Sequence, residues 1–366
     1  KKELGAFFTP PTYAKKSVEL VREAIKLVPK GNDYIILDRC AGTGSLEAEL
    51  SDKELEHTIV STYEYYEYKV LLERFNGRVR HIIPPTDDNV EFSAGFVVNA
   101  DALSEDFVNN EIIKQHIDNP KCTVILFENP PYSDTSATDF INEYGQVKTD
   151  RRNKFVTEEM KKDIENFKEK RASTREISNL FIWSGFKYYL RQPTDSYILF
   201  SPVKYFKSIG LVNKTFRKGF LFNRAFFHAS PSAISVICWQ NVDKKQESFN
   251  LPAFDIDTKN TIEVDDELKH VKDVEINKVN KLISTLNDRR TFEDDIKTNF
   301  VCGSDGKPEP YDNNKGRQPV YNSNIVAYLS IQGFVVAPNN VHLVRANFKT
   351  GIQQSFGFHL RNDNYH

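Results

Sequence analysis

The chain has 366 residues, a formal net charge of −2 at pH 7, 39% hydrophobic residues and 27% charged residues. This length exceeds one ordinary hydrophobic core, so we expect a large α/β domain followed by a second region. A net charge this close to zero excludes attraction of nucleic acid by the net charge of the whole protein. Any binding of nucleic acid must therefore use a local basic face.

The cysteine pattern and the apolar runs exclude further classes of protein. The four cysteines are far apart and form no CxxC pair, so we expect neither a metal site nor a disulfide framework, and a reducing, cytoplasmic setting. No apolar run approaches the ~18 residues that span a bilayer, so we expect no membrane partner. The first residue is Lys1 rather than Met, which leads us to expect a piece of a longer polypeptide.

In chain order, the first predicted element is a helix, because Val18, Val21, Ile25 and Val28 recur at helical spacing. A short apolar run at residues 35–37 then predicts a buried strand, and a helix is predicted from Ser45 onward. The remaining predictions are strands at residues 58–62, 95–98, 123–127, 197–200 and 233–239, and a helix at 68–75. Strands that alternate with helices predict a parallel sheet with helices on both faces.

Two stretches of different composition suggest the domain organisation. Residues 133–178 are rich in charged residues and predict an exposed excursion inserted in the domain. The polar stretch at residues 241–247 predicts a boundary, which divides the chain into a first domain, 1–245, and a second region, 246–366.

The first candidate site follows the strand at residues 35–37 and reads Asp38-Arg39-Cys40-Ala41-Gly42-Thr43-Gly44. Gly42 and Gly44 allow a ligand to approach the backbone closely, and a helix N-terminus after them would present donors to a carboxylate or phosphate. The third glycine of a dinucleotide-binding fingerprint is missing, which weakens an NAD interpretation.

Two acids stand after the next two predicted strands, at the same edge of the expected sheet. Glu64 lies twenty residues beyond Gly44, where a carboxylate can accept both ribose hydroxyls of a nucleoside. Asp101 lies where a carboxylate can accept a hydrogen bond from an adenine amino group. A glycine turn and two helix-capping acids would explain these residues one at a time. Because all three motifs stand at the ends of predicted parallel strands, a nucleoside site is favoured.

The second candidate site is Asn129-Pro130-Pro131-Tyr132, directly after the strand at residues 123–127. Proline fixes the turn and holds Asn129 extended. The Asn129 side-chain oxygen and the Pro130 carbonyl can then accept hydrogen bonds from an exocyclic amine, and Tyr132 offers a flat face to a planar base. A rigid strand-ending turn without a catalytic role would show the same residues.

Together these motifs resemble the γ-type DNA adenine-N6 methyltransferase family over residues 3–245. Residues 5–10, which include Phe7, Phe8, Thr9 and Pro10, resemble its N-terminal cofactor motif, and residues 38–44 resemble its central cofactor motif. The resemblance implies a Rossmann-like class I methyltransferase sheet and S-adenosylmethionine as cofactor. The cofactor-binding residues that it implies are Phe7, Phe8, Thr9, Pro10, Asp38, Cys40, Ala41, Gly42, Gly44, Glu64, Asp101, Ala102 and Asn129.

The resemblance also implies the reaction, which is direct transfer of a methyl group to N6 of an adenine rotated out of double-stranded DNA. The implied catalytic residues are Asn129, Pro130, Pro131 and Tyr132. An aromatic side chain on the opposite face of the base is expected at Phe227, although a place in the core suits Phe227 equally well. Arg39 departs from the pattern, because proline is common at its position in the family.

The short region 246–366 implies a partial DNA-recognition region, and a restriction nuclease and a specificity region are expected as fused or associated partners. Two other functions remain open. One is a methyltransferase that acts on protein glutamine or on ribosomal RNA amines, which would lack the Phe7-Phe8-Thr9-Pro10 element. The other is a module that binds the cofactor without catalysis.

Overall fold

The computed structural model describes part of the chain in full. The described ranges are 9–85, 92–93, 96–132, 155–163, 174, 176–202, 205–206, 211–223, 227, 233–245, 248–256 and 268–277, followed by the backbone of five short strands. Phe7 and Phe8 of the predicted N-terminal motif, and most of the predicted 133–178 excursion, lie outside these residues.

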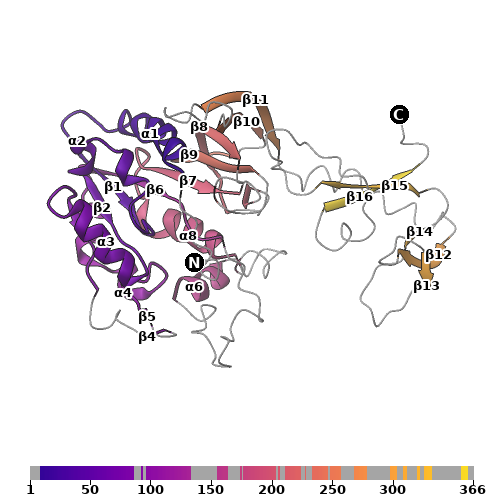
Figure 1. Ribbon diagram of the computed structural model, residues 1–366, viewed down its shortest axis with the longest axis horizontal. Helices are drawn as coiled ribbons and strands as arrows, with labels where there is room; N and C mark the ends of the chain where they lie inside the picture. Colours follow the sequence, from indigo (N-terminus) through magenta and orange to yellow (C-terminus); the bar gives the residue numbers. More distant parts are fainter. Residues whose placement is uncertain are drawn as a thin grey trace, which may run out of the picture.

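A nine-stranded mixed sheet organises the described chain in the order β11-β10-β8-β9-β7-β6-β1-β2-β3 (Figure 1). Its strands are β1 (Asp33–Asp38), β2 (Thr58–Val60), β3 (His81–Ile82), β6 (Cys122–Glu128), β7 (Ser196–Ser201), β8 (Lys214–Asn223), β9 (Ala233–Asp243), β10 (Ser248–Ile256) and β11 (Leu268–Asn277). The five strands β3, β2, β1, β6 and β7 pair in parallel, whereas β9 pairs antiparallel with both β7 and β8.

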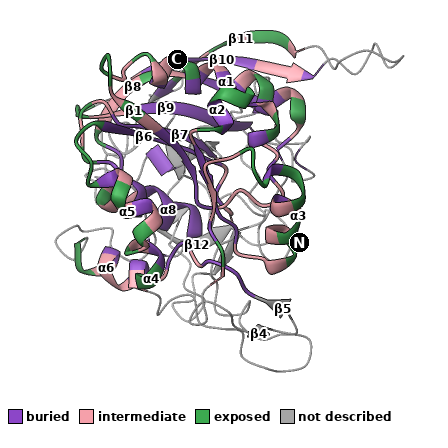
Figure 2. Ribbon diagram, turned by 90° about the vertical axis from the view of Figure 1, so that its left-hand side faces the viewer, coloured by how far each residue is buried: buried purple, intermediate pink, exposed green. Residues whose placement is uncertain are grey.

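Alternate side chains of the central strands pack on opposite faces of the sheet, as the two-residue period of a strand requires. In β1, Ile35 and Leu37 belong to one hydrophobic cluster and Ile36 belongs to the other. In β6, Leu126 and Phe127 divide in the same way. Strands buried on both faces read as continuous apolar runs, which is why the sequence predicts β1 and β6 well (Figure 2).

Helices cover both faces of the sheet. Helix α1 packs against β6, β7, β8 and β9, and its buried residues belong to the cluster that contains Ile36. Helix α5 packs against β6, and its Ile113 joins the cluster of Ile35, as does Leu180 of α8. The helices are α1 (Pro11–Ile25), η2 (Glu47–Glu49), α2 (Asp52–Leu55), α3 (Tyr65–Phe75), α4 (Glu105–Val108), α5 (Glu111–Ile117), α6 (Phe155–Asp163), α8 (Ile177–Ser184) and the π-helical turn η6 (Gly185–Tyr189).

The mixed α/β sheet with helices on both faces confirms the predicted fold class, with three corrections. The sheet is not parallel throughout, because the predicted strand at 233–239 lies in β9, which pairs antiparallel with β7 and β8. The predicted strand at 95–98 does not join the main sheet, because β5 (Phe96–Val97) pairs with β4 (Phe92–Ser93) and β3 takes the place beside β2. The prediction of a helix from Ser45 is also wrong. Residues 42–46 form turns, η2 has three residues, and the next helix begins at Asp52 behind the capping residue Ser51.

Strands β10 and β11 follow residue 245 and still belong to the main sheet. The sheet therefore extends beyond the predicted domain boundary, and the division into two domains stays a prediction. Further along, the backbone forms two small sheets, which contain β12 (Lys297–Cys302), β13 (Pro308–Pro310) and β14 (Val320–Tyr321), and β15 (Ile325–Ile331) and β16 (Phe356–Arg361). Among the described helices, none combines the length and hydrophobicity needed to cross a membrane.

Candidate functional site

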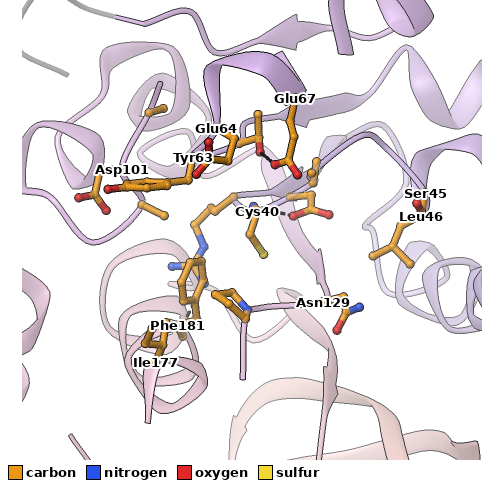
Figure 3. A pocket seen from close by; sticks show the side chains of 18 of the residues that line it. Cys40, Ser45, Leu46, Tyr63, Glu64, Glu67, Asp101, Asn129, Ile177 and Phe181 are labelled. Atoms are coloured by element: carbon orange, nitrogen blue, oxygen red, sulfur yellow. Dashed lines mark hydrogen bonds between the residues drawn. The ribbon is translucent and has the colours of Figure 1, made fainter. Parts of the chain in front are cut away.

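A pocket opens at the carboxyl ends of β1, β2 and β6 (Figure 3). The chain runs from β1 outward to β2 and β3, and then returns to β6 on the other side of β1. A ligand site is expected at such a reversal of strand order, because the loops diverge there and leave a crevice.

The pocket brings together most of the predicted site residues from five separate segments. Those that line it are Thr9, Asp38, Cys40, Ala41, Gly42, Glu64, Asp101, Ala102, Asn129 and Pro131. Pro10, Gly44, Pro130, Tyr132 and Phe227 are not among its lining residues. The sequence therefore locates the site, but it does not separate the residues that face the pocket from those that support it.

The glycine-containing loop begins where β1 ends and is held by its own backbone. The Cys40 amide donates to Oδ1 of Asp38 at 2.8 Å, and the Ala41 amide donates to the Ser61 carbonyl beyond β2 at 2.9 Å. Gly42 has φ +58°, and a Cβ there would meet only the Glu67 carboxylate, at 3.9 Å. Gly42 is therefore the glycine at which the backbone faces the open pocket.

Gly44 has a different role from the predicted one. It has φ +80°, and a Cβ there would lie 2.3 Å from the ring of Phe75 and 3.1 Å from Leu71. Both of these residues are buried in α3. Gly44 thus lets the loop pack on the helix that follows Glu64.

Glu64 and Asp101 reach the pocket on two loops that are tied together. Glu64 is the N-cap residue of α3 and forms an isolated bridge with Val98. Buried Asn99 donates from its side chain to the Thr62 carbonyl at 3.0 Å and from its backbone to the Tyr63 carbonyl at 2.7 Å. Figure 3 shows Tyr63, Glu64 and Asp101 along one side of the pocket, with Asn129 apart from them.

Asn129 follows the last residue of β6 and is held on both ends of its amide. Its Nδ2 donates to Oγ1 of Thr9 at 2.8 Å, and the Tyr132 hydroxyl donates to its Oδ1. Thr9 is 4% exposed and stands just before α1, so it contacts Asn129 across 120 residues of sequence. These contacts orient the Asn129 oxygen toward Tyr132 and its nitrogen toward Thr9.

The pocket is acidic. Its lining includes four carboxylates, those of Asp38, Glu64, Glu67 and Asp101, and one basic side chain, Arg39. The Arg39 guanidinium already forms an ion pair with buried Glu128. A ligand with positive charge is favoured here over a phosphate or a dinucleotide.

A second buried acid lies next to Asp38. Both Asp38 and Glu47 are at most 1% exposed. Burial raises the pKa of Glu47 to about 7, and burial together with the neighbouring Glu47 and Glu128 raises the pKa of Asp38 well above its usual range. Two neighbouring buried carboxyls do not both ionise readily, and a cation in the pocket would favour their ionisation.

Phe227 is a core residue, which contradicts its predicted role as a second stacking face. It is 1% exposed and stacks on Tyr13 of α1 with a centroid separation of 5.8 Å. Its ring packs on the buried face of α1, where burial and stacking both stabilise an aromatic pair. Its neighbours Phe226 and His228 lie outside the described residues.

Several lining residues were missed in the sequence. Thr62, Tyr63, Ala100 and Leu103 adjoin the predicted acids, so their place could have been inferred from those positions. Glu67 lies one helical turn after Glu64. Ile177 and Phe181 come from α8, which lies far along the chain from the predicted motifs. No group of three or more His, Cys, Asp or Glu side chains suited to a metal occurs among the described residues.

Comparison with known proteins finds similarity in structure only. No protein-family profile and no curated protein sequence matches the chain. The type IIG restriction endonuclease BpuSI matches over 81% of this chain and 36% of its own, with 12% identity and a TM-score of 0.42. The methyltransferase subunit of a type I restriction-modification system from Streptococcus thermophilus matches over 73% of this chain and 50% of its own, with 15% identity and a TM-score of 0.42.

An rRNA methyltransferase, aviRa from Streptomyces viridochromogenes, matches over 64% of this chain and 86% of its own, with 9% identity and a TM-score of 0.28. The chain thus spans between about a third and a half of the length of the first two proteins.

Proposed function

We propose that the chain is an S-adenosylmethionine-dependent DNA methyltransferase that acts on adenine N6 within a restriction–modification system. The observation that carries the proposal is the acidic pocket at the reversal of strand order, in which Glu64, Asp101 and Asn129 line one cavity. Double-stranded DNA is the proposed partner, together with a fused or associated nuclease and specificity region.

The pocket residues fit this cofactor better than a nucleotide. S-adenosylmethionine carries a sulfonium and an ammonium group, and the acidic lining of the pocket favours such a cation. Open space at Gly42, where φ is +58°, suits close approach of a ligand to the backbone. Glu64 would accept the ribose hydroxyls and Asp101 the adenine amino group.

When bound, the cofactor supplies an electrophilic methyl group. The chain's own residues would then hold the target amine. The Asn129 oxygen would accept a hydrogen bond from that amine, which orients the nitrogen lone pair and stabilises the positive charge that develops on it. This oxygen has two lone pairs, so it can accept from the amine and from the Tyr132 hydroxyl. The ring of Tyr132 would stack on the base.

The first test is cofactor affinity, measured by calorimetry. We expect Glu64→Ala and Asp101→Ala each to weaken binding of S-adenosylmethionine by roughly 1.5–3 kcal/mol, because each removes a charge-assisted or paired hydrogen bond. Glu56→Ala, which changes an exposed acid outside the pocket, serves as the control. Unchanged affinity in both pocket variants would refute the cofactor assignment.

The second test is the substrate of the wild-type chain. Transfer of a labelled methyl group to DNA, RNA and protein is compared, and N6-methyladenine is identified by mass spectrometry. The proposal expects label in DNA adenine. Label in RNA or in a protein amide, with normal cofactor binding, would retain the cofactor site and reject DNA as the substrate.

A further prediction concerns Thr9, which accepts the hydrogen bond from Nδ2 of Asn129. Thr9→Val keeps the shape and removes the acceptor, so we expect turnover to fall about threefold to tenfold. Thr9→Ser keeps the hydroxyl and should retain most of the activity. The measurement is kcat and the cofactor KM for both variants. A rise in the cofactor KM alone would mean that Thr9 contacts the cofactor and does not orient Asn129.

A further inference from the structure

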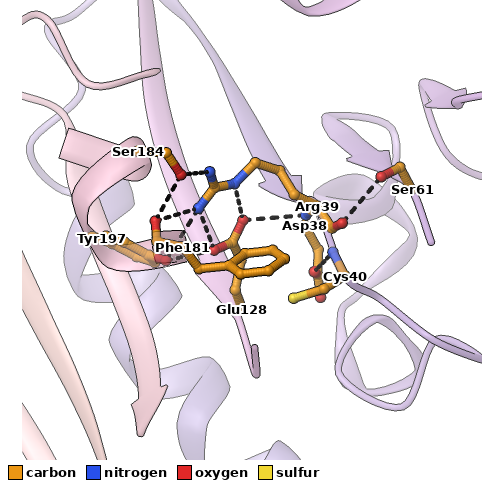
Figure 4. Close-up of polar contacts among 8 residues, drawn as sticks. All are labelled: Asp38, Arg39, Cys40, Ser61, Glu128, Phe181, Ser184 and Tyr197. Carbon is orange, nitrogen blue, oxygen red and sulfur yellow. Dashed lines mark hydrogen bonds and ion pairs between the residues drawn. The ribbon is translucent and has the colours of Figure 1, made fainter. Parts of the chain in front are cut away.

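The residue that departs from the family pattern, Arg39, forms a fully buried ion pair (Figure 4). The side chains of Arg39 and Glu128 are both 0% exposed. Two parallel contacts join them, from Nε to Oε1 at 2.5 Å and from Nη2 to Oε2 at 2.8 Å. The Arg39 backbone amide also donates to Oε1, at 3.2 Å. The pair therefore fixes the side chain and the main chain of Arg39 against Glu128.

The two residues stand at equivalent points of neighbouring strands. Leu37 of β1 pairs with Leu126 of β6, so Arg39 lies beside Glu128 two residues further on. Arg39 leads directly into the glycine-containing loop, and Glu128 leads directly into Asn129. The ion pair thus connects the bases of the two loops that line the pocket.

The same guanidinium reaches a third element of the pocket wall. Its Nη1 donates to Oγ of Ser184 at 2.8 Å, and its Nη2 donates to the Phe181 carbonyl at 2.9 Å. Phe181 itself lines the pocket. From β7, the Tyr197 hydroxyl donates to Oε2 of Glu128 at 2.6 Å. Helix α8 and strand β7 are therefore both bonded to the ion pair that joins the two loops.

A buried ion pair is a poor means of stabilising a fold, because desolvation of both charges offsets their attraction. An apolar pair of similar volume is often as stable. What a bidentate pair does provide is a fixed distance and a fixed relative orientation. A need to align the two loops with each other therefore explains this geometry better than a need to stabilise the fold.

We infer that Arg39 and Glu128 are positioning residues that align the Asn129 loop with the glycine-containing loop. The inference rests on the proposed function, in which these loops hold the target amine and the cofactor. Neither side chain needs to contact a reacting atom. A displacement of about 1 Å between donor and acceptor can cost on the order of 100-fold in rate, so loss of the pair should act on the transfer step.

The test compares two buried acids that bond to opposite ends of β6. Glu128→Gln changes the pocket end of β6. Asp195→Asn changes a carboxylate that is 1% exposed and accepts from the Val124, Arg191 and Gln192 amides at the opposite end. Both variants should lower the melting temperature. At a temperature where both are folded, we expect the single-turnover rate to fall at least about tenfold in Glu128→Gln alone, with the cofactor KM changed less than about threefold.

Replacement of the whole pair separates alignment from folding. The variant Arg39→Met with Glu128→Leu should melt at a higher temperature than Glu128→Gln, because no charge is left unpaired. We expect its transfer rate to stay low. Recovery of the rate together with the melting temperature would overturn the inference, as would an equal loss of rate in Asp195→Asn.

Hydrogen exchange supplies a readout that does not depend on activity. We expect S-adenosylmethionine to slow amide exchange in residues 39–46 of both the wild type and Glu128→Gln, but in residues 122–132 of the wild type only. Equal protection of both segments in the two proteins would overturn the alignment role. A wild type that binds cofactor but methylates no DNA would reject the proposed function, and the exchange result would still decide the role of the pair.

Discussion

Asn129→Ala should reduce methyl transfer to adenine by on the order of 10²–10³-fold, the effect of deleting one preorganised electrostatic partner. The amide oxygen is proposed to accept from the target amine as positive charge develops on its nitrogen. That interaction strengthens in the transition state, so its loss falls on turnover more than on substrate binding. Single-turnover methylation at saturating cofactor and DNA measures the effect.

Two comparisons make the result specific. Asn109→Ala removes an exposed asparagine at the end of α4 and should leave the rate unchanged. Calorimetry should find cofactor affinity within about threefold of wild type in Asn129→Ala, because the lost acceptor is assigned to the target amine. Full methylation of adenine N6 by Asn129→Ala would reject the proposed mechanism, whatever the fold.

The second large effect is expected at Gly44, and it should appear first as lost stability. Gly44→Ala places a Cβ 2.3 Å from the Phe75 ring, on a backbone with φ +80°. Overpacking and a left-handed backbone each cost about 1–3 kcal/mol, so we expect a loss of about 2–6 kcal/mol in the free energy of unfolding. Because Phe75 belongs to the helix that Glu64 caps, cofactor affinity should fall as well.

Gly77→Ala is the matched control for the backbone contribution. Gly77 has φ +77° and nothing within 4 Å of the added Cβ, so it reports the strain of the conformation without a clash. Urea unfolding of both variants measures the difference. A loss at Gly44 no greater than that at Gly77 would mean that contact with Phe75 does not constrain the loop.

The sequence by itself determined the central strands and the location of the site. β1 and β6 are short apolar runs buried on both faces, a pattern typical of parallel strands in an α/β sheet. The loops after them can be recognised in the sequence by Gly42 and by Asn129-Pro130-Pro131. Glycine and proline determine which backbone angles their own segment can adopt, so they mark loops locally. Parallel strands then bring both loops to one edge of the sheet. This placement can be predicted without knowing any side-chain contact.

Only the tertiary structure decided how individual side chains are used. Phe227 could equally have faced a base or the core, and its contact with Tyr13 placed it in the core. The segment at 95–98 has the pattern of a strand, but β3 occupies the position beside β2. Arg39 and Glu128 are separated by 89 positions, and a lone charge gives no local sign of its partner. Such choices depend on which distant surfaces meet, whereas local periodicity reports only which face of each segment is apolar.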